Sequence, residues 1–99
     1  MHKVKFKEWD CIVQFAKYAN NNRTAIELIH ATEGDSVAMA TINVPDEELE
    51  EDEVVIKDYS ENEGMFEALV NANIISESVY HVATGMIMSP VCKLLVEPK

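Results

Sequence analysis

Residues Lys3–Tyr18 read KVKFKEWDCIVQFAKY, and polar and apolar side chains alternate along the first half of this stretch. A period of two is typical of a β-strand with one buried face, and the β-branched and aromatic residues that follow also favour a strand. In the second half, apolar side chains at alternate positions would share one face: Trp9, Cys11, Val13 and Phe15. We therefore expect a long strand here, bulged near Glu8.

Two more strands should follow in an antiparallel meander. Asn20–Arg23 favours a tight turn, because asparagine tolerates positive φ, and Thr24–Ala31 after it has the composition of a strand. Glu33–Asp35, with its central glycine, indicates the next turn. The third strand is predicted over Val37–Val44, and Pro45 ends it because proline has no amide hydrogen for a strand ladder.

One helix is expected in the second half of the chain. Ser60–Glu63 reads SENE and matches the capping box, in which the serine oxygen accepts from the amide three residues on and the glutamate reaches back. Apolar side chains then recur at helical spacing: Met65, Phe66, Leu69 and Val70. Asn73 is placed to end the helix in a left-handed conformation, with Ile74 folding back on it.

Short strands are predicted on both sides of this helix. Val54–Ile56 precedes it, and Val79–Met88 and Val91–Val96 follow it, separated by Ser89–Pro90. With 99 residues, 47% of them hydrophobic, the chain is expected to be one domain over residues 1–99. We predict an α+β fold, in which one α-helix packs on a mainly antiparallel β-sheet of about six strands.

The charge of the chain is unevenly distributed. The formal net charge is −10, and seven of the eight residues from Asp46 to Glu53 are acidic. These are Asp46, Glu47, Glu48, Glu50, Glu51, Asp52 and Glu53. So much like charge predicts a surface loop over residues 45–53, either merely solvated or acting as a decoy that a phosphate-binding groove of a protein partner would accept. Direct binding to nucleic acid is not expected of so negative a chain.

Features of membrane or secreted proteins are not evident. The longest apolar runs fall far below the roughly 20 residues that cross a bilayer, and the first residues have no apolar signal core. Cys11 and Cys92 stand far apart among apolar neighbours, which favours buried free thiols. We expect a cytoplasmic protein without membrane contact.

The sequence contains no recognisable catalytic, cofactor or metal motif. His2, His30 and His81 do not share the spacing of a metal site, and His30 falls in phase with core positions of its strand. The three glycines are isolated, so no phosphate-binding loop is formed. We predict that the protein is not an enzyme and that it has no catalytic residues, no metal and no cofactor.

Four polar residues are candidates for binding a ligand or partner: Arg23, Asp58, Tyr59 and Asn62. Arg23 is the only arginine and lies in a turn, where its planar fork could hold a carboxylate or a phosphate. Capping does not account for the other three, which lie on a loop. In the alternative interpretation Tyr59 packs ahead of the helix and Asn62 fills its first turn.

Several segments also resemble a family of short proteins of unknown function encoded by bacteriophages, plasmids and other mobile elements. The similarity is carried by Trp9–Cys11, by Lys17–Tyr18 with Arg23–Leu28, by Val55–Met65 (VIKDYSENEGM) and by Pro90–Leu94. The resemblance implies a bacterial host and an accessory factor that binds host macromolecules or signalling molecules.

These observations lead to one principal hypothesis and one alternative. The principal hypothesis is a non-enzymatic binding protein that modulates or counters a host system by occupying a protein partner. The alternative is an oligomeric sponge for a small anionic molecule or nucleotide near Arg23 and Ser60–Met65. A homo-oligomer is expected in either case, because one sheet face would leave apolar side chains uncovered: Ile12, Ala16, Tyr18, Ile29 and Met39.

Overall fold

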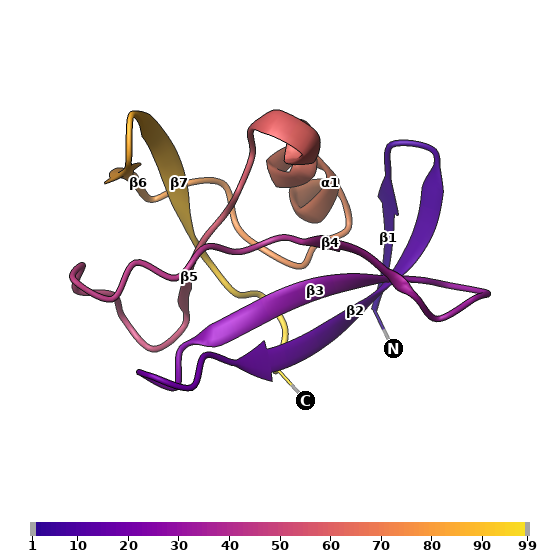
Figure 1. Ribbon diagram of the computed structural model, residues 1–99, viewed down its shortest axis with the longest axis horizontal. Coiled ribbons are helices and arrows are strands. Elements are labelled where there is room, and N and C mark those ends of the chain that lie inside the picture. The colour runs from indigo at the N-terminus through magenta and orange to yellow at the C-terminus, as the bar shows by residue number, and fades with distance from the viewer. Residues whose placement is uncertain (1, 99) are drawn as a thin grey trace.

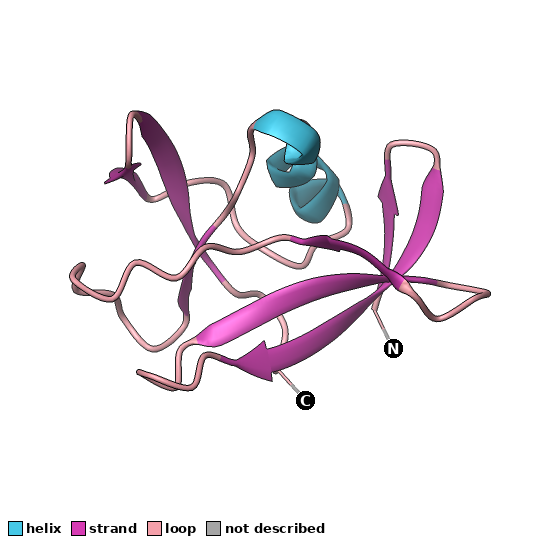
Figure 2. Cartoon of the chain, in the orientation of Figure 1, coloured by secondary structure: helices cyan, strands magenta, loops and turns pink. Residues whose placement is uncertain are grey.

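The computed structural model describes residues 2–98, which form two antiparallel sheets and one α-helix (Figures 1 and 2). The first sheet has the order β1-β2-β3-β4, built from β1 (Lys3–Phe6), β2 (Trp9–Lys17), β3 (Thr24–His30) and β4 (Ser36–Met39). The second has the order β5-β7-β6, built from β5 (Glu53–Val55), β6 (Tyr80–Thr84) and β7 (Ile87–Lys93). Helix α1 spans Met65–Asn71. The predicted α+β class is confirmed, with two sheets where one was expected.

The stretch Lys3–Tyr18 forms a hairpin and not one long strand. Lys7 takes a φ of 55°, and the chain folds back so that Phe6 pairs with Trp9 and Val4 with Cys11. This reversal places all the apolar side chains of β1 on the core side, where Val4 and Phe6 are buried. The meander therefore contains four strands, and the prediction of a bulged single strand was wrong.

The third predicted strand ends early because the chain crosses from one sheet to the other. β4 stops at Met39, and the Ala40 amide still donates to the Ile26 carbonyl of β3 at 2.8 Å. Beyond it Thr41 forms an antiparallel bridge with Ile56. Residues after Ala40 therefore belong with the second sheet.

The C-terminal strands meet at a different turn from the one predicted. The chain reverses at Gly85, which has a φ of 69°, and Pro90 lies inside β7. The Pro90 carbonyl accepts from the Ile56 amide at 3.0 Å, so its nitrogen also faces the β5 side of β7. Because β5 ends at Val55, the missing amide hydrogen costs one bond at the end of that pairing.

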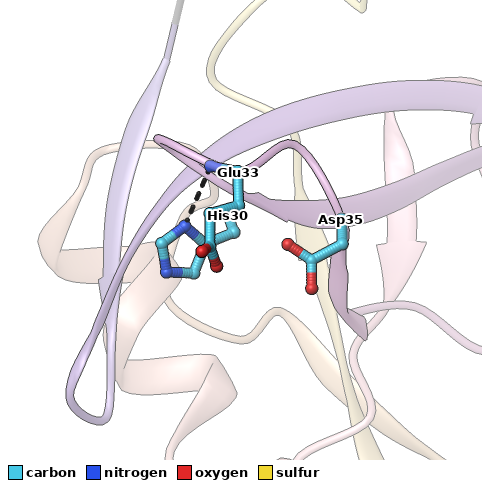
Figure 3. A group of neighbouring side chains, drawn as sticks. All are labelled: His30, Glu33 and Asp35. Carbon is cyan, nitrogen blue, oxygen red and sulfur yellow. Dashed lines mark hydrogen bonds between the residues drawn. The ribbon is translucent and has the colours of Figure 1, made fainter.

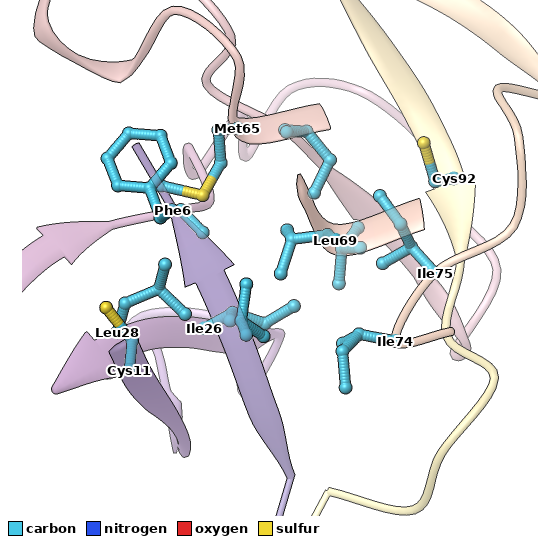
Figure 4. Packing of buried hydrophobic residues seen from close by; sticks show 13 residues of the cluster. Phe6, Cys11, Ile26, Leu28, Met65, Leu69, Ile74, Ile75 and Cys92 are labelled. Atoms are coloured by element: carbon cyan, nitrogen blue, oxygen red, sulfur yellow. The ribbon is translucent and has the colours of Figure 1, made fainter. Parts of the chain in front are cut away.

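The core lies between the two sheets and under the helix (Figure 4). Its largest fully buried side chains lie on β1, β3 and α1 and in the segments just after β5 and α1: Phe6, Ile26, Leu28, Ile56, Met65, Leu69, Ile74 and Ile75. Cys11 and Cys92 are buried free thiols in the same cluster, as predicted. A smaller cluster of Val55, Val82 and Val91 packs beneath the segment that follows Ile42.

The side chain of Asp58, and not the predicted capping box, caps the start of the helix. Its Oδ1 accepts hydrogen bonds from the amides of Gly64, at 3.1 Å, and Phe66, at 2.9 Å. Ser60 instead opens a short 3₁₀ turn, Ser60–Asn62, and provides no side-chain cap for α1. The predicted end of the helix is confirmed, because Asn73 has a φ of 60° and the Ile74 amide bonds back to Leu69.

We predict that Asp58→Ala lowers the free energy of unfolding by about 1 kcal/mol, the usual cost of losing a cap. Asp58→Asn should lose less, because the amide oxygen can still accept. Glu63→Ala, which removes the partner that a capping box would need, should leave the urea midpoint unchanged. If Glu63→Ala destabilises the fold as much as Asp58→Ala, the assignment of the cap is incorrect.

Candidate functional site

Six exposed carboxylates lie in the segment between β5 and the point after Ala40 where the chain crosses to the second sheet. We call residues 45–52 the acidic segment; its acidic members are Asp46, Glu47, Glu48, Glu50, Glu51 and Asp52, all exposed. In Figure 1 the acidic segment lies at the same end of the long axis as β6 and at the opposite end from β1. One end of the molecule is therefore strongly negative.

Arg23 anchors the acidic segment to the first sheet. Its guanidinium Nη1 donates to the Val44 carbonyl at 2.6 Å, and its Nη2 donates to the Glu47 carbonyl. On the other side of the segment, Leu49 packs against the smaller core cluster. A planar fork that holds two backbone carbonyls fixes the chain direction as well as its position. The carboxylates therefore project from a backbone that is held in place.

Glu53 differs from the other acidic residues of the predicted loop. It belongs to β5 and is only 6% exposed. Its Oε1 accepts from the Glu50 amide at 2.8 Å and from the Tyr80 hydroxyl at 3.2 Å. The prediction that the loop extends to residue 53 was wrong at this position, because Glu53 closes the segment from inside and does not present its charge to a partner.

The negative potential of the segment reaches β6. Burial, together with the charges of Glu53, Glu47 and Glu50, raises the pKa of the Tyr80 phenol. Tyr80 and Arg23 both line a shallow hollow whose remaining walls come from Pro45–Glu50 and Glu53. Tyr80 was not recognised from the sequence as a neighbour of the acidic segment, although the predicted strand Val79–Met88 contains it, because its contact with Glu53 is long-range.

The structure gives Arg23 a role in holding the chain. Both nitrogens of its fork are engaged with backbone carbonyls, and carboxylates surround it. An anionic ligand would have to displace these bonds and overcome the negative potential. The arrangement therefore favours a cationic ligand over an anionic one.

The other three predicted residues do not form one site with Arg23. Asp58 caps α1, so the expectation that capping does not account for this residue was wrong. Asn62 is 2% exposed, and its Nδ2 donates to the Met39 carbonyl at 2.6 Å, so it ties the 3₁₀ turn to β4. Tyr59 is half-buried, with Lys57 Nζ 5.7 Å from its ring centroid. Tyr59 and Asp58 do line one small hollow of about 180 Å³, together with His81.

A group of metal-ligating side chains lies at the β3–β4 turn (Figure 3). One ligand atom from each of His30, Glu33 and Asp35 falls within 4.8 Å of the others. His30 Nδ1, however, accepts from the amides of Thr32 and Glu33, both at 3.3 Å. These hydrogen bonds occupy the Nδ1 lone pair, and the tautomer that accepts them carries its proton on Nε2, so a metal ion at His30 would have to displace them.

The two thiols lack the setting of a nucleophile. Burial and the charge of Asp58 raise the pKa of Cys92 to about 12, and burial and Asp10 raise the pKa of Cys11. Reactive cysteines have lowered pKa values and an electropositive, partly exposed environment. Cys11 and Cys92 are instead buried and have raised pKa values.

No family model, curated protein or solved structure matches the chain. The resemblance to proteins of mobile elements therefore stays a prediction. Within residues 2–98, no helix has the length and apolar character that crossing a membrane requires.

We predict that Arg23→Lys loosens the acidic segment without unfolding the protein, because an ammonium cannot hold two carbonyls in a fork. Hydrogen exchange of the Glu47 and Glu50 amides should become faster, while the amides of β2 and β3 keep their protection. Lys17→Ala removes an exposed positive charge that lines a second hollow together with Arg23, and it serves as the control. Equal exchange in both variants would contradict the anchoring role.

We also predict that the thiols react slowly with iodoacetamide. With its pKa raised to about 12, the Cys92 thiol is almost entirely protonated at pH 8, and only the thiolate reacts. Alkylation at pH 8 should be at least about 100-fold slower in the folded protein than in urea. Rapid modification of the folded chain would contradict the assignment of both thiols as buried and unreactive.

Proposed function

We propose that the protein is a non-enzymatic binding protein whose acidic segment occupies a basic groove on a protein partner. The observation that supports this most strongly is the anchoring of the segment by Arg23, with six carboxylates left exposed. A segment that is ordered before binding loses less entropy in the complex than a free loop does. Closely spaced negative charges also accelerate association with a positive surface.

A groove that binds nucleic acid is the matching surface on the partner. Such grooves place lysines and arginines at the spacing of phosphates, and a row of carboxylates offers them comparable charge. The resemblance to mobile-element proteins would make this partner a host protein in the bacterial cytoplasm. Occupying its groove would counter or modulate the host system to which it belongs.

The alternative proposal, a sponge for a small anionic molecule, has less support. Arg23 is engaged and surrounded by carboxylates. At the helix start, Asp58 already accepts from the amides of Gly64 and Phe66. Thermal-shift screening against nucleotides distinguishes the two proposals, since a ligand that binds the folded state raises the melting temperature by mass action.

Self-association remains a further proposal, based on the outer face of the first sheet. Ala16 and Met39 are exposed there, and Ile12 and Ile29, which pair across β2 and β3, are half-buried. A second copy could cover this face. Light scattering that returns the monomer mass of 11.1 kDa at micromolar concentration would contradict it.

The acidic surface is tested by neutralising it without changing its shape. In the test variant, every exposed carboxylate of the acidic segment becomes its amide: Asp46→Asn, Glu47→Gln, Glu48→Gln, Glu50→Gln, Glu51→Gln and Asp52→Asn. Glu53 is kept, because it holds the segment from inside. Proteins captured from a bacterial lysate by the wild-type chain should be lost by this variant and released by salt.

The matched control neutralises six exposed carboxylates elsewhere and so has the same net charge. Its changes are Glu8→Gln, Glu33→Gln, Asp35→Asn, Glu63→Gln, Glu67→Gln and Glu77→Gln. This variant should retain the captured partner. If both variants lose it alike, total charge and not the acidic segment determines binding, and the proposal fails.

A further inference from the structure

β6 is an unpaired edge of the second sheet. In the order β5-β7-β6 it has β7 on one side and no strand of the described chain on the other. Edge strands present free amides and carbonyls, and proteins usually cover them or protect them with charge. Ala83 and His81, in the middle of β6, are exposed, and β6 contains neither a lysine nor a proline that would protect its edge.

The register identifies which backbone groups face outward. The β6–β7 hairpin turns at two residues, Gly85 and Met86, so Thr84 and Ile87 form its closing hydrogen-bonded pair. Antiparallel pairs alternate, and His81–Pro90 and Ala83–Met88 are then the pairs without mutual hydrogen bonds. The amides and carbonyls of His81 and Ala83 therefore point away from β7.

Apolar side chains surround this edge. Five large ones are exposed on β6, on β7 and in the connections next to them: Val79, Tyr80, Met86, Ile87 and Met88. An extended segment laid along β6 would bring its own side chains over them at a period of two. The edge thus offers both hydrogen bonds and apolar contact.

The charge beside the edge determines what kind of segment fits. Tyr80, at the start of β6, lies in the field of Glu47 and Glu50, and its hydroxyl bonds to Glu53. A basic segment would gain from this field. A second copy of this chain, with a net charge of −10, would bring a second negative field to the same place.

We propose that β6 docks an extended, basic segment of a protein partner by strand addition, with the acidic segment binding its lysines or arginines. The inference rests on the proposed function and specifies its partner. Backbone hydrogen bonds from His81 and Ala83 would set the register, and the carboxylates would select the charge. The partner is then recognised through an extended strand and not only through a charged groove.

The test uses synthetic peptides and the 99-residue chain. The probe is acetyl-VKVKVKV-amide, with acetyl-VEVEVEV-amide as the charge control and acetyl-VKVPVKV-amide as the control that cannot form a continuous strand ladder. The protein variant is Ala83→Pro, which removes one outward amide hydrogen on an edge strand and leaves the bonds to β7 intact. Affinity is measured by fluorescence anisotropy at low and at physiological salt.

The lysine peptide should bind at least about tenfold more tightly than either control peptide, and Ala83→Pro should weaken it by about tenfold. Amide exchange in the wild-type chain provides a second readout, should Ala83→Pro fail to fold: the His81 and Ala83 amides should gain protection when the lysine peptide is added.

Three results would overturn the inference. If the variant with six neutralised carboxylates loses the peptide but Ala83→Pro keeps it, the acidic surface stands and docking at β6 is incorrect. If the His81 and Ala83 amides gain no protection, the peptide binds elsewhere. If those amides are already protected in the free protein at a concentration where light scattering shows a dimer, a second copy occupies the edge.

Discussion

The chain crosses from the first sheet to the second at Ala40, and the other features of the structure depend on this crossing. The Ala40 amide bonds to β3, whereas the Ala40 carbonyl accepts from Lys57 at 2.9 Å and the Ile42 amide donates to Val55 at 3.0 Å. The residues just after Ala40 are thus paired with the end of β5 and the residues beyond it. This pairing joins the sheets over one core, and it closes a loop whose exposed part is the acidic segment.

A loop closed in this way must still overcome its own charge. Six carboxylates within seven residues repel one another, and the repulsion favours extended, solvated conformations. Arg23, Leu49 and Glu53 oppose it with a guanidinium fork, an apolar anchor and a buried hydrogen-bond acceptor, respectively. The same contacts bring the segment next to Tyr80, the first residue of β6. The acidic segment and the unpaired strand β6 are therefore neighbours. The sequence of either one does not predict this.

Periodicity and turn composition predicted the fold class and several of its turns, but not every strand. β3, the Asn22 turn, the Gly34 turn and the end of α1 at Asn73 lie where the sequence indicated, because glycine and asparagine at those positions adopt positive φ. The hairpin at Lys7 was missed, since a lysine with positive φ has no such signal. The turn at Gly85 was assigned to Pro90 instead, because proline is a strong strand breaker unless its nitrogen faces the end of a neighbouring strand.

The candidate site was predictable only in part, for a related reason. The acidic run is visible as composition, but Arg23 lies more than twenty residues away from the carbonyls it holds, and Asp58 caps a helix that begins beyond the expected box. Long-range contacts of this kind leave no local pattern. The anchoring of the acidic segment is tested most directly by backbone ¹⁵N relaxation over residues 45–52 in the free protein. Order parameters near those of β5, at about 0.85, would support an acidic segment held in place, and values below about 0.6 would show a free loop and contradict it.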